Sequence, residues 1–291
     1  MKKKVFFAAA LLGLSLLTAC GSQKKAESSA AGDSSVAGSS AAGSSAAEAS
    51  GDKVITVGAS PSPHAEILAA AKNALKAEGY ELKVVEYTDY VQPNIALNDK
   101  ELDANFFQHL PYLDNFISEH KEMKLANAGG VHIEPMGVYS RKIKKLDELS
   151  DGASVAIPND PTNGGRSLLL LEKAGLLKLR EGAGTNPTVH DITENKKNLK
   201  FQEVEAAQVP RTLDDVDAAV INTNYAMQAN LVPTKDALFM EDSTSPYVNI
   251  VAVRTGDEKR PEIQALMKAL RSEEVKKFID EKYKGAIVPA F

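Results

Sequence analysis

Cysteine and tryptophan are nearly absent from the sequence: its 291 residues include one cysteine, Cys20, and no tryptophan. The chain after Cys20 therefore has no thiol, which excludes disulfides, thiolate nucleophiles and cysteine-ligated metals there. The five histidines show no zinc-type spacing, and no phosphate-binding glycine loop or G-x-S-x-G motif occurs. We therefore expect no metal, no cofactor and no enzymatic activity.

Charge of one sign is not concentrated anywhere. The formal net charge is −5, and acidic and basic residues are interspersed along the chain. A nucleic-acid-binding protein would show a basic patch or stripe, so nucleic acid is not an expected partner. Beyond the N-terminus, no apolar run approaches the length of a membrane-spanning helix.

The N-terminus has the pattern of a secretory signal. Three lysines, Lys2 to Lys4, precede an apolar stretch over 5–17 that is too short to span a bilayer. The residues 17–20, Leu-Thr-Ala-Cys, then resemble the lipobox of bacterial lipoproteins. The resemblance implies a signal peptide over 1–19 and a Cys20 that is acylated and becomes the mature N-terminus. The alternative is an ordinary secreted protein in which the cysteine stands there by chance.

Residues 20–51 begin with that cysteine and continue as serine, alanine and glycine with a few charges. No apolar periodicity is present, so we expect a flexible tether. A Ser/Gly-rich coil of this length spans about 30 Å on average. It would let a folded domain move while it stays anchored to the membrane.

The remaining residues alternate between strand and helix patterns. A β-branched run over 53–59, a helix ending at Gly79 and a strand over 82–87 form a β-α-β opening, which predicts a parallel sheet with covered faces. Two α/β lobes fit the pattern better than one doubly wound sheet, which is the alternative. Further strands are expected at 103–106, 136–140, 153–157, 199–204, 217–222 and 248–254, and further helices at 94–97, 111–120, 146–149, 167–174, 225–229, 261–270 and 272–283.

Five segments resemble the NlpA family of methionine-binding lipoproteins, which serve methionine ABC importers. They are YTDYVQPN (87–94), NFFQHLPYL (105–113), PNDPTNGGRSLLLL (158–171), VINTNYA (220–226) and SPYVNI (245–250). The resemblance runs from about Lys53 to the C-terminus, and the segments occur in the family's order.

The resemblance implies a fold and a domain organisation. The family has the type II periplasmic-binding-protein fold, an α/β fold in which two lobes are joined by two crossovers and hold a ligand in the cleft. On that basis, residues 52–130 and 247–291 are expected to form lobe 1, and residues 131–246 to form lobe 2.

A guanidinium and an amide stand near the start of an expected apolar helix. Arg166 follows Asn163-Gly164-Gly165, where free backbone N–H groups and the helix dipole already attract anions. A guanidinium added there can hold a carboxylate at two points. A surface ion pair is the alternative for Arg166, and capping of the helix is the alternative for Asn163.

An aromatic group with polar tips is formed by Tyr90, Phe107, His109 and Tyr112. The matching positions in the family line the pocket for the ligand's side chain. Sulfur pairs favourably with aromatic edges, so such a pocket suits a thioether. Core packing is the alternative for these aromatics, and a hydrogen-bonded structural role is the alternative for His109.

Two asparagines, Asn222 and Asn249, follow apolar β residues at or near strand ends. An amide offers both a donor and an acceptor, as an α-ammonium and an α-carboxylate together require. The matching residues in the family contact the backbone of the amino-acid ligand. The alternative for Asn222 is a turn residue that ends the strand.

The resemblance implies a substrate-binding lipoprotein that captures methionine for the permease and ATPase subunits of an ABC importer. It would be held on the extracytoplasmic face of the cell membrane by a lipid anchor. The alternatives are a binding protein for D-methionine, a methionine-containing dipeptide or another amino acid. A secreted hydrolase and a surface adhesin are further alternatives, and no Ser-His-acid or paired-carboxylate arrangement supports the hydrolase.

Overall fold

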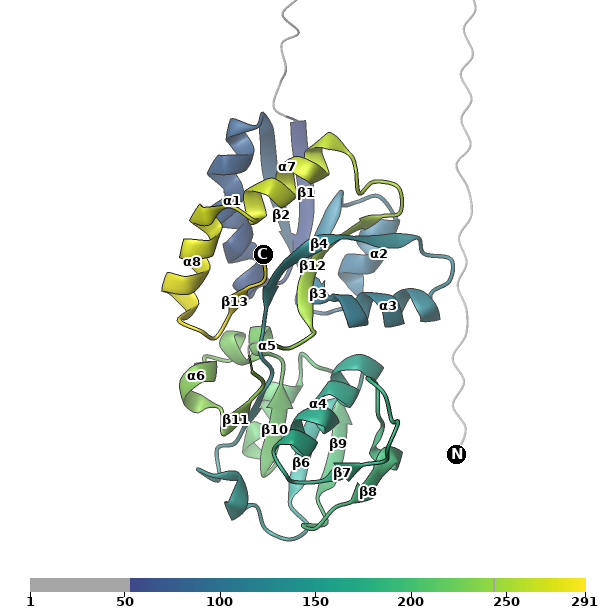
Figure 1. Cartoon of the computed structure of the whole chain (residues 1–291), viewed down its shortest axis with the longest axis vertical. Coiled ribbons are helices and arrows are strands. Elements are labelled where there is room, and N and C mark those ends of the chain that lie inside the picture. Colours follow the sequence, from purple (N-terminus) through teal and green to yellow (C-terminus); the bar gives the residue numbers. More distant parts are fainter. Residues whose placement is uncertain (1–52, 243) are drawn as a thin grey trace, which may run out of the picture. The chain divides into compact units, whose positions relative to one another are not determined.

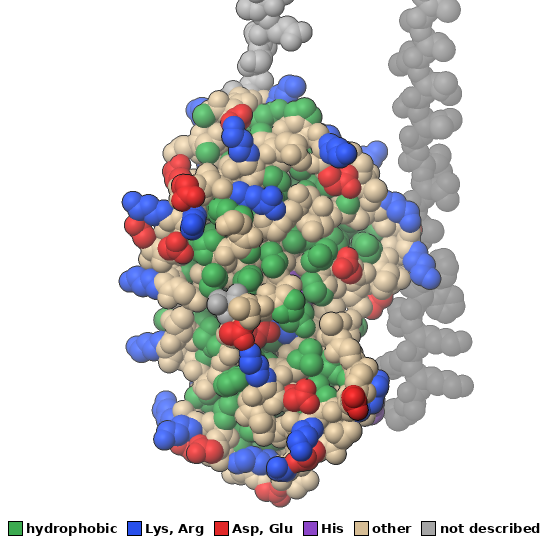
Figure 2. Space-filling view, in the orientation of Figure 1, with side chains coloured by type: hydrophobic (Ala, Val, Ile, Leu, Met, Phe, Trp, Pro, Cys, Tyr) green, Lys and Arg blue, Asp and Glu red, His purple; other side chains and the backbone are tan. Residues whose placement is uncertain are grey.

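The computed structural model describes residues 53–242 and 244–291 (Figure 1). The predicted signal peptide, Cys20 and the tether lie outside the described residues. None of the described helices is long and apolar enough to cross a membrane. Figure 2 shows lysine, arginine and acidic side chains interspersed on the face in view, as the sequence predicts.

One sheet contains the β-α-β opening. Its six strands lie in the order β13-β4-β12-β3-β1-β2. Strand β1 is parallel to β2 and β3, whereas β12 is antiparallel to both β3 and β4. The strands are β1 (Lys53–Ala59), β2 (Tyr80–Glu86), β3 (Ala104–His109), β4 (Leu125–Ile133), β12 (Val248–Arg254) and β13 (Val288–Pro289).

Helices cover both faces of this sheet because its strands are apolar on both sides. On β12, Val251 and Val253 pack with helices α1, α7 and α8, while Ile250 and Ala252 pack with α2 and α3 on the opposite face (Figure 1). Continuous apolar strands of this kind are typical of sheets buried on both faces. The helices are α1 (Glu66–Ala77), α2 (Gln92–Asn98), α3 (Leu110–Glu119), α7 (Pro261–Leu270) and α8 (Glu273–Tyr283).

A second sheet has five strands in the order β11-β5-β10-β6-β9. Strand β6 is parallel to β9 and β10, and β5 is antiparallel to β10 and β11. Helix α4 (Pro161–Lys173) packs on one face of it. The strands are β5 (Gly137–Tyr139), β6 (Ser154–Pro158), β9 (Lys200–Val204), β10 (Ala218–Ile221) and β11 (Phe239–Met240).

Shorter elements complete the second half. Helix α5 (Thr223–Gln228) begins directly after β10, and α6 (Pro233–Asp236) precedes β11. Strands β7 (Lys178–Leu179) and β8 (Ile192–Glu194) form a separate pair. Short helical segments are η1 (Pro61–Ala65), η2 (Leu146–Glu148), η3 (Val189–Asp191) and η4 (Val209–Asp214).

Two segments of chain connect the two sheets. Residues 134–136 run from β4 of the first sheet to β5 of the second, and residues 241–247 return from β11 to β12. The lobe boundaries expected from the sequence, at 130/131 and 246/247, stay predictions. Strand β4 pairs within the first sheet as far as Ile133.

The predicted start of the helix at Ser167 is wrong, because α4 begins at Pro161. Asp160 is its N-cap and accepts a hydrogen bond from the Asn163 backbone N–H at 2.9 Å, so Asn163 is not the cap. The two glycines serve close packing. A Cβ on Gly164 would lie 2.8 Å from the Pro158 carbonyl oxygen, and one on Gly165 would lie 2.7 Å from Asn186 Cα.

From its residue type and its place before Pro63, Ser62 would be expected to cap the helix that ends at Gly79, but it does not. Its backbone is extended, with φ −136° and ψ 138°, and regular helix begins only at Glu66. Strand β4 was not predicted at all. Its sequence contains Gly129 and Gly130, which interrupt the apolar alternation, and its pairing with β12 is irregular at two points. A Cβ on Gly130 would lie 2.7 Å from Val248 Cγ1, so the strand needs glycine to approach its neighbour.

Candidate functional site

A cavity is lined by residues from both halves of the fold. It lies where β3 of the first sheet ends and β12 begins, near the start of α4 and the end of β10 in the second half. All eight side chains predicted as ligand-binding line it: Tyr90, Phe107, His109, Tyr112, Asn163, Arg166, Asn222 and Asn249. Gln108, Glu134, Thr223 and Asn224 also line it and were not predicted.

One wall of the cavity is aromatic. The ring centroid of Tyr90 lies 5.8 Å from that of Phe107 and 5.7 Å from that of Tyr112, in tilted and edge-on arrangements. The polar tips are satisfied: the Tyr112 hydroxyl donates to the Tyr90 carbonyl at 3.1 Å, and the Tyr90 hydroxyl donates to Asn224 Oδ1 at 2.6 Å. Burial raises the pKa of both hydroxyls, so they stay neutral. This wall suits an apolar group.

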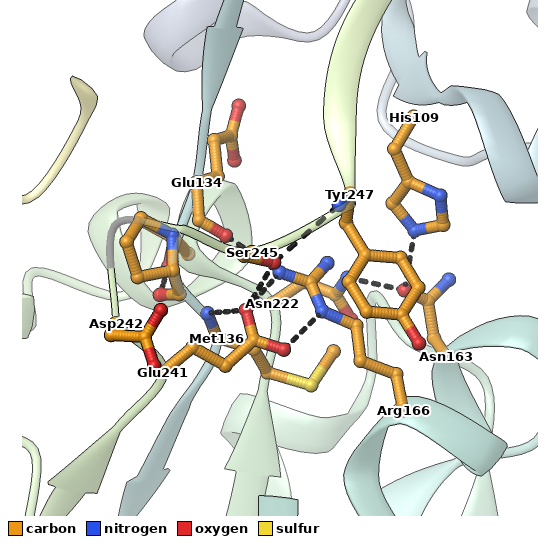
Figure 3. A network of polar contacts seen from close by, with 12 residues as sticks. His109, Glu134, Met136, Asn163, Arg166, Asn222, Glu241, Asp242, Ser245 and Tyr247 are labelled. Carbon is orange, nitrogen blue, oxygen red and sulfur yellow. Dashed lines mark hydrogen bonds and ion pairs between the residues drawn. The ribbon is translucent and has the colours of Figure 1, made fainter. Parts of the chain in front are cut away.

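Arg166 is engaged by a protein carboxylate (Figure 3). Its Nε donates to Glu241 Oε1 at 2.7 Å, and its Nη2 donates to Glu241 Oε2 at 2.5 Å and to the Glu134 carbonyl at 2.8 Å. The guanidinium carbon lies 4.2 Å from the ring centre of Tyr247. The sequence suggested that both points of the fork would serve a ligand. In the structure, Nη1 is the nitrogen of the guanidinium that remains available to a ligand, because it has no acceptor among the described residues.

His109, Asn163 and Asn222 form a hydrogen-bonded group. His109 Nδ1 accepts from the Tyr112 backbone N–H at 3.1 Å, so its Nε2 carries the proton and donates to Asn163 Oδ1 at 3.1 Å. Asn222 Nδ2 donates to the same oxygen at 2.8 Å. Desolvation, and then the positive charge of Arg166, lower the pKa of His109 to about 3. The imidazole is therefore neutral at physiological pH.

Glu134 is a buried carboxylate that the sequence reading missed. His132 Nε2 lies 2.8 Å and His64 Nε2 3.2 Å from its Oε1, and its Oε2 accepts from the Asn224 backbone N–H at 3.1 Å. Burial raises the pKa of Glu134, while His64 and Arg166 oppose the rise. Burial lowers the pKa of His64 to about 4 and that of His132 to about 3.

His64, His132 and Glu134 have the donor types of a zinc site, and their donor atoms lie within 4.8 Å of one another. However, both Nε2 atoms face the carboxylate at hydrogen-bond distance. Within the described chain neither Nδ1 has the hydrogen-bond partner that orients a metal-binding imidazole. The geometry is that of a neutral His132 imidazole that donates a hydrogen bond to Glu134, with the neutral imidazole of His64 beside it.

Asn249, on β12, contacts His64 of the His64–His132–Glu134 cluster. His64 Nε2 lies 3.0 Å from Asn249 Oδ1, so the neutral imidazole donates to that oxygen. The amide nitrogen of Asn249 is then the atom available to the cavity. The oxygen of Asn222, in contrast, is buried and has no donor among the described residues.

Signals for two missed residues were present in the sequence. Asn224 stands two residues after Asn222 at the same strand end, and Glu134 directly follows β4. Side chains at strand ends are the ones that face ligands in α/β folds. Glu134 was missed because β4 was missed.

The cavity can therefore bind a small molecule with three distinct parts. Glu134 and the Asn222 oxygen can accept hydrogen bonds from a cationic group, and Arg166 Nη1 can donate to an anionic group. The aromatic wall can contact an apolar tail. The described lining residues contain no serine, cysteine or lysine that could act as a nucleophile.

Comparison with known proteins agrees with this geometry. The model of the NlpA lipoprotein family matches residues 55–291. The methionine-binding lipoprotein MetQ of Bacillus subtilis is 43% identical over 99% of this chain and 98% of its own length. The D-methionine-binding lipoprotein MetQ of Escherichia coli is 45% identical over 80% of this chain and 87% of its own length.

A solved structure is also similar. The nutrient-binding protein from Burkholderia cenocepacia bound to methionine is 51% identical, with a TM-score of 0.79, over 81% of this chain and 100% of that one. This likeness confirms the predicted two-lobe binding-protein fold. Together with the match of the family model over nearly all the described residues, it leaves one conclusion: the chain belongs to the NlpA lipoprotein family.

Proposed function

We propose that this protein binds free methionine in the cavity between its two halves and delivers it to the permease of an ABC importer. The observation that carries the proposal is the cavity's complementary polarity. A buried carboxylate lines a cavity with an aromatic wall, together with an amide oxygen and a guanidinium nitrogen that have no hydrogen-bond partner among the described residues. An α-ammonium, an α-carboxylate and a thioether side chain match these groups.

The ammonium is assigned to Glu134 and Asn222. Glu134 Oε2 accepts one protein hydrogen bond, from Asn224, and keeps capacity for another. The Asn222 oxygen has no donor from the described protein, and a buried acceptor without a partner costs free energy that a ligand can recover. Both groups favour a positively charged donor.

The carboxylate is assigned to Arg166 Nη1 and to the amide nitrogen of Asn249. Glu241 already neutralises much of the Arg166 charge. The guanidinium therefore acts on the ligand as a well-positioned hydrogen-bond donor, and its full charge is not free for an anion. The site therefore favours a zwitterionic ligand over one with two negative charges, since both charges of such a ligand would have to share Arg166 with Glu241.

The side chain is assigned to the wall formed by Tyr90, Phe107 and Tyr112. An unbranched thioether can lie between these rings and gain about 0.3–1.5 kcal/mol from sulfur–aromatic contacts.

Anchoring through Cys20 and the tether would keep the domain near its permease. Lipid modification with at least two acyl chains gives stable attachment. The relatives named as lipoproteins support this placement. The chain is thus a binding protein and not an enzyme, as its family membership indicates.

Calorimetric titration tests the proposal. The mature protein, refolded to strip retained ligand, is titrated with L-methionine, D-methionine, a methionine dipeptide and leucine. We expect methionine to bind tightest, and Asn222→Ala to weaken it by roughly tenfold because a hydrogen bond to a charged group is lost. Asn73→Ala, on the exposed surface of α1, is the matched control. A folded protein that binds neither enantiomer would reject methionine as the ligand.

A further inference from the structure

A half-buried aspartate outside the cavity controls an amide inside it. Asp160 caps α4 and does not line the cavity. Both of its carboxylate oxygens accept from Asn163 Nδ2, at 2.9 and 3.1 Å. A carboxylate in this position can only accept, so the nitrogen of Asn163 must face Asp160 and its oxygen must face the other way.

The fixed orientation of the Asn163 amide also fixes the orientation of the Asn222 amide. Asn163 Oδ1 receives His109 Nε2 at 3.1 Å and Asn222 Nδ2 at 2.8 Å. The proton on His109 Nε2 is itself fixed, because Nδ1 accepts from a backbone N–H. Asn222 must therefore turn its nitrogen toward Asn163, which leaves its oxygen buried and without a protein donor in the described chain.

We infer that Asp160 is a positioning residue that makes the site specific for a free α-amino group. Acting through Asn163, it holds the Asn222 oxygen toward the ligand, where an ammonium can donate to it. The inference rests on the proposed function, since it concerns the same ligand. It adds a specificity determinant that touches no ligand atom.

The chain of hydrogen bonds also predicts what happens when the carboxylate is lost. In Asp160→Asn, the new side chain can still cap α4 through its oxygen. In the place of Oδ1, its oxygen can also accept from Asn163 Nδ2, but its nitrogen, in the place of Oδ2, then lies against Asn163 Nδ2, so two donors face each other. One of the acceptors that hold the Asn163 amide is thus replaced by a repelling donor, while His109 still donates to its oxygen. The amides of Asn163 and Asn222 are therefore held less firmly, and a donor N–H of Asn222 faces the ligand ammonium part of the time.

The test compares two ligands that differ only at the α-carbon. Methionine and 4-(methylsulfanyl)butanoate share a carboxylate and a thioether, but the second has no amino group. In Asp160→Asn we expect methionine affinity to fall about tenfold, the worth of one hydrogen bond to a charged group, while the affinity for the deamino compound changes little. The preference for methionine therefore falls about tenfold. Asp160→Ser, which keeps a capping oxygen but cannot engage the amide with two, should lower the same ratio.

A double-mutant cycle separates the relay from the charge of Asp160 acting through space. In the Asn222→Ala background, Asp160→Asn should leave the ratio of the two ligand affinities nearly unchanged. The amide that Asp160 positions through Asn163 is then absent. Asp280→Asn, on the exposed surface of α8, controls for loss of one negative charge. Circular dichroism of each variant reports that α4 and the fold are retained.

Three results would overturn the inference. If Asp160→Asn and Asp160→Ser weaken both ligands equally, Asp160 is only a helix cap. If the ratio falls as much in the Asn222→Ala background, the effect is direct electrostatics. If the parent protein binds no methionine, the proposed function fails and the inference falls with it; a parent that binds methionine with an unaltered ratio in the variants overturns the relay alone.

Discussion

The guanidinium of Arg166 and the carboxylate of Glu241 form a two-point ion pair in which the side chains are 2% and 12% exposed. The pair stands between the cavity and the two segments that connect the sheets, because Arg166 also donates to the Glu134 carbonyl and Glu241 also accepts from the Met136 backbone N–H at 3.0 Å. Arg166 therefore contributes to stability as well as to ligand binding.

Removing Arg166 should destabilise the protein without ligand. Arg166→Ala leaves Glu241 with an uncompensated, largely buried charge, and breaking such a pair costs about 3–5 kcal/mol of unfolding free energy. Urea denaturation of the ligand-free protein measures this. The control is Arg141→Ala, whose ion pair with Asp214 is exposed, and which should cost less than about 1 kcal/mol. Equal losses in the two variants would contradict the buried role of Arg166.

The aromatic wall should favour a thioether over a branched alkyl chain. We expect methionine to bind more tightly than leucine, and Phe107→Leu to reduce that preference by between about twofold and twelvefold, the range expected for one sulfur–aromatic contact. Competition calorimetry gives the ratio. Phe201→Leu, on β9 and away from the cavity, is the control. Leucine binding as tightly as methionine to the parent protein would point to another amino acid as the ligand.

Stability should fall as the pH falls below the ordinary pKa of histidine. The pKa of His64 is lowered to about 4 and those of His109 and His132 to about 3, mainly by desolvation. Between pH 6.5 and these values the unfolded chain binds protons that the native protein does not, so unfolding becomes easier as acid is added. One such histidine accounts for about 3 kcal/mol between pH 6.5 and 4.

The raised pKa values of Glu134 and Asp160 act in the opposite direction, because the native protein holds those protons to higher pH. His109 is therefore the clearest probe, since it does not contact Glu134. In His109→Gln the unfolding free energy should depend less steeply on pH between 6.5 and 4. An unchanged slope would mean that His109 is not a neutral, desolvated imidazole in the native protein.

Membrane attachment should depend on one atom, the sulfur of Cys20. Cys20→Ala removes the proposed site of acylation and leaves no thiol in the sequence. We expect the variant to move from the membrane fraction to the soluble fraction, while its affinity for methionine stays the same. Retention of the variant in the membrane fraction, at the level of the parent, would reject lipid anchoring through this residue.

Much of the fold could be predicted from apolar runs with clear ends. The strand expected at 53–59, the strand at 248–254 and the helix at 261–270 agree with β1, β12 and α7 residue for residue. In each case local propensity and burial favour the same structure. Strand β4 and the first turn of α4 were missed because Gly129, Gly130, Gly164 and Gly165 look like loop residues, although tertiary contacts require them.

All eight predicted site residues line one cavity, but their hydrogen-bond partners could not be predicted. Glu241 lies 75 residues from Arg166, and His64 lies 185 residues from Asn249. Nothing local in the sequence connects these pairs. The one connection that spacing does reveal is Asp160 followed by Pro161 and Asn163, which is the pattern of a capped helix start.

Arg166 binds Glu134 at the start of one connecting segment and Glu241 at the start of the other, and Glu241 also accepts from the Met136 backbone N–H, so any rotation of one half of the fold against the other must carry this pair with it. Dissolved ions screen exposed charges but act little on a pair that is shielded from water. We therefore expect the rate at which the cleft opens and releases its ligand to vary little with ionic strength. If the chain serves a permease as we propose, unloading would then respond to contacts made with that partner and hardly at all to the salinity of the surroundings.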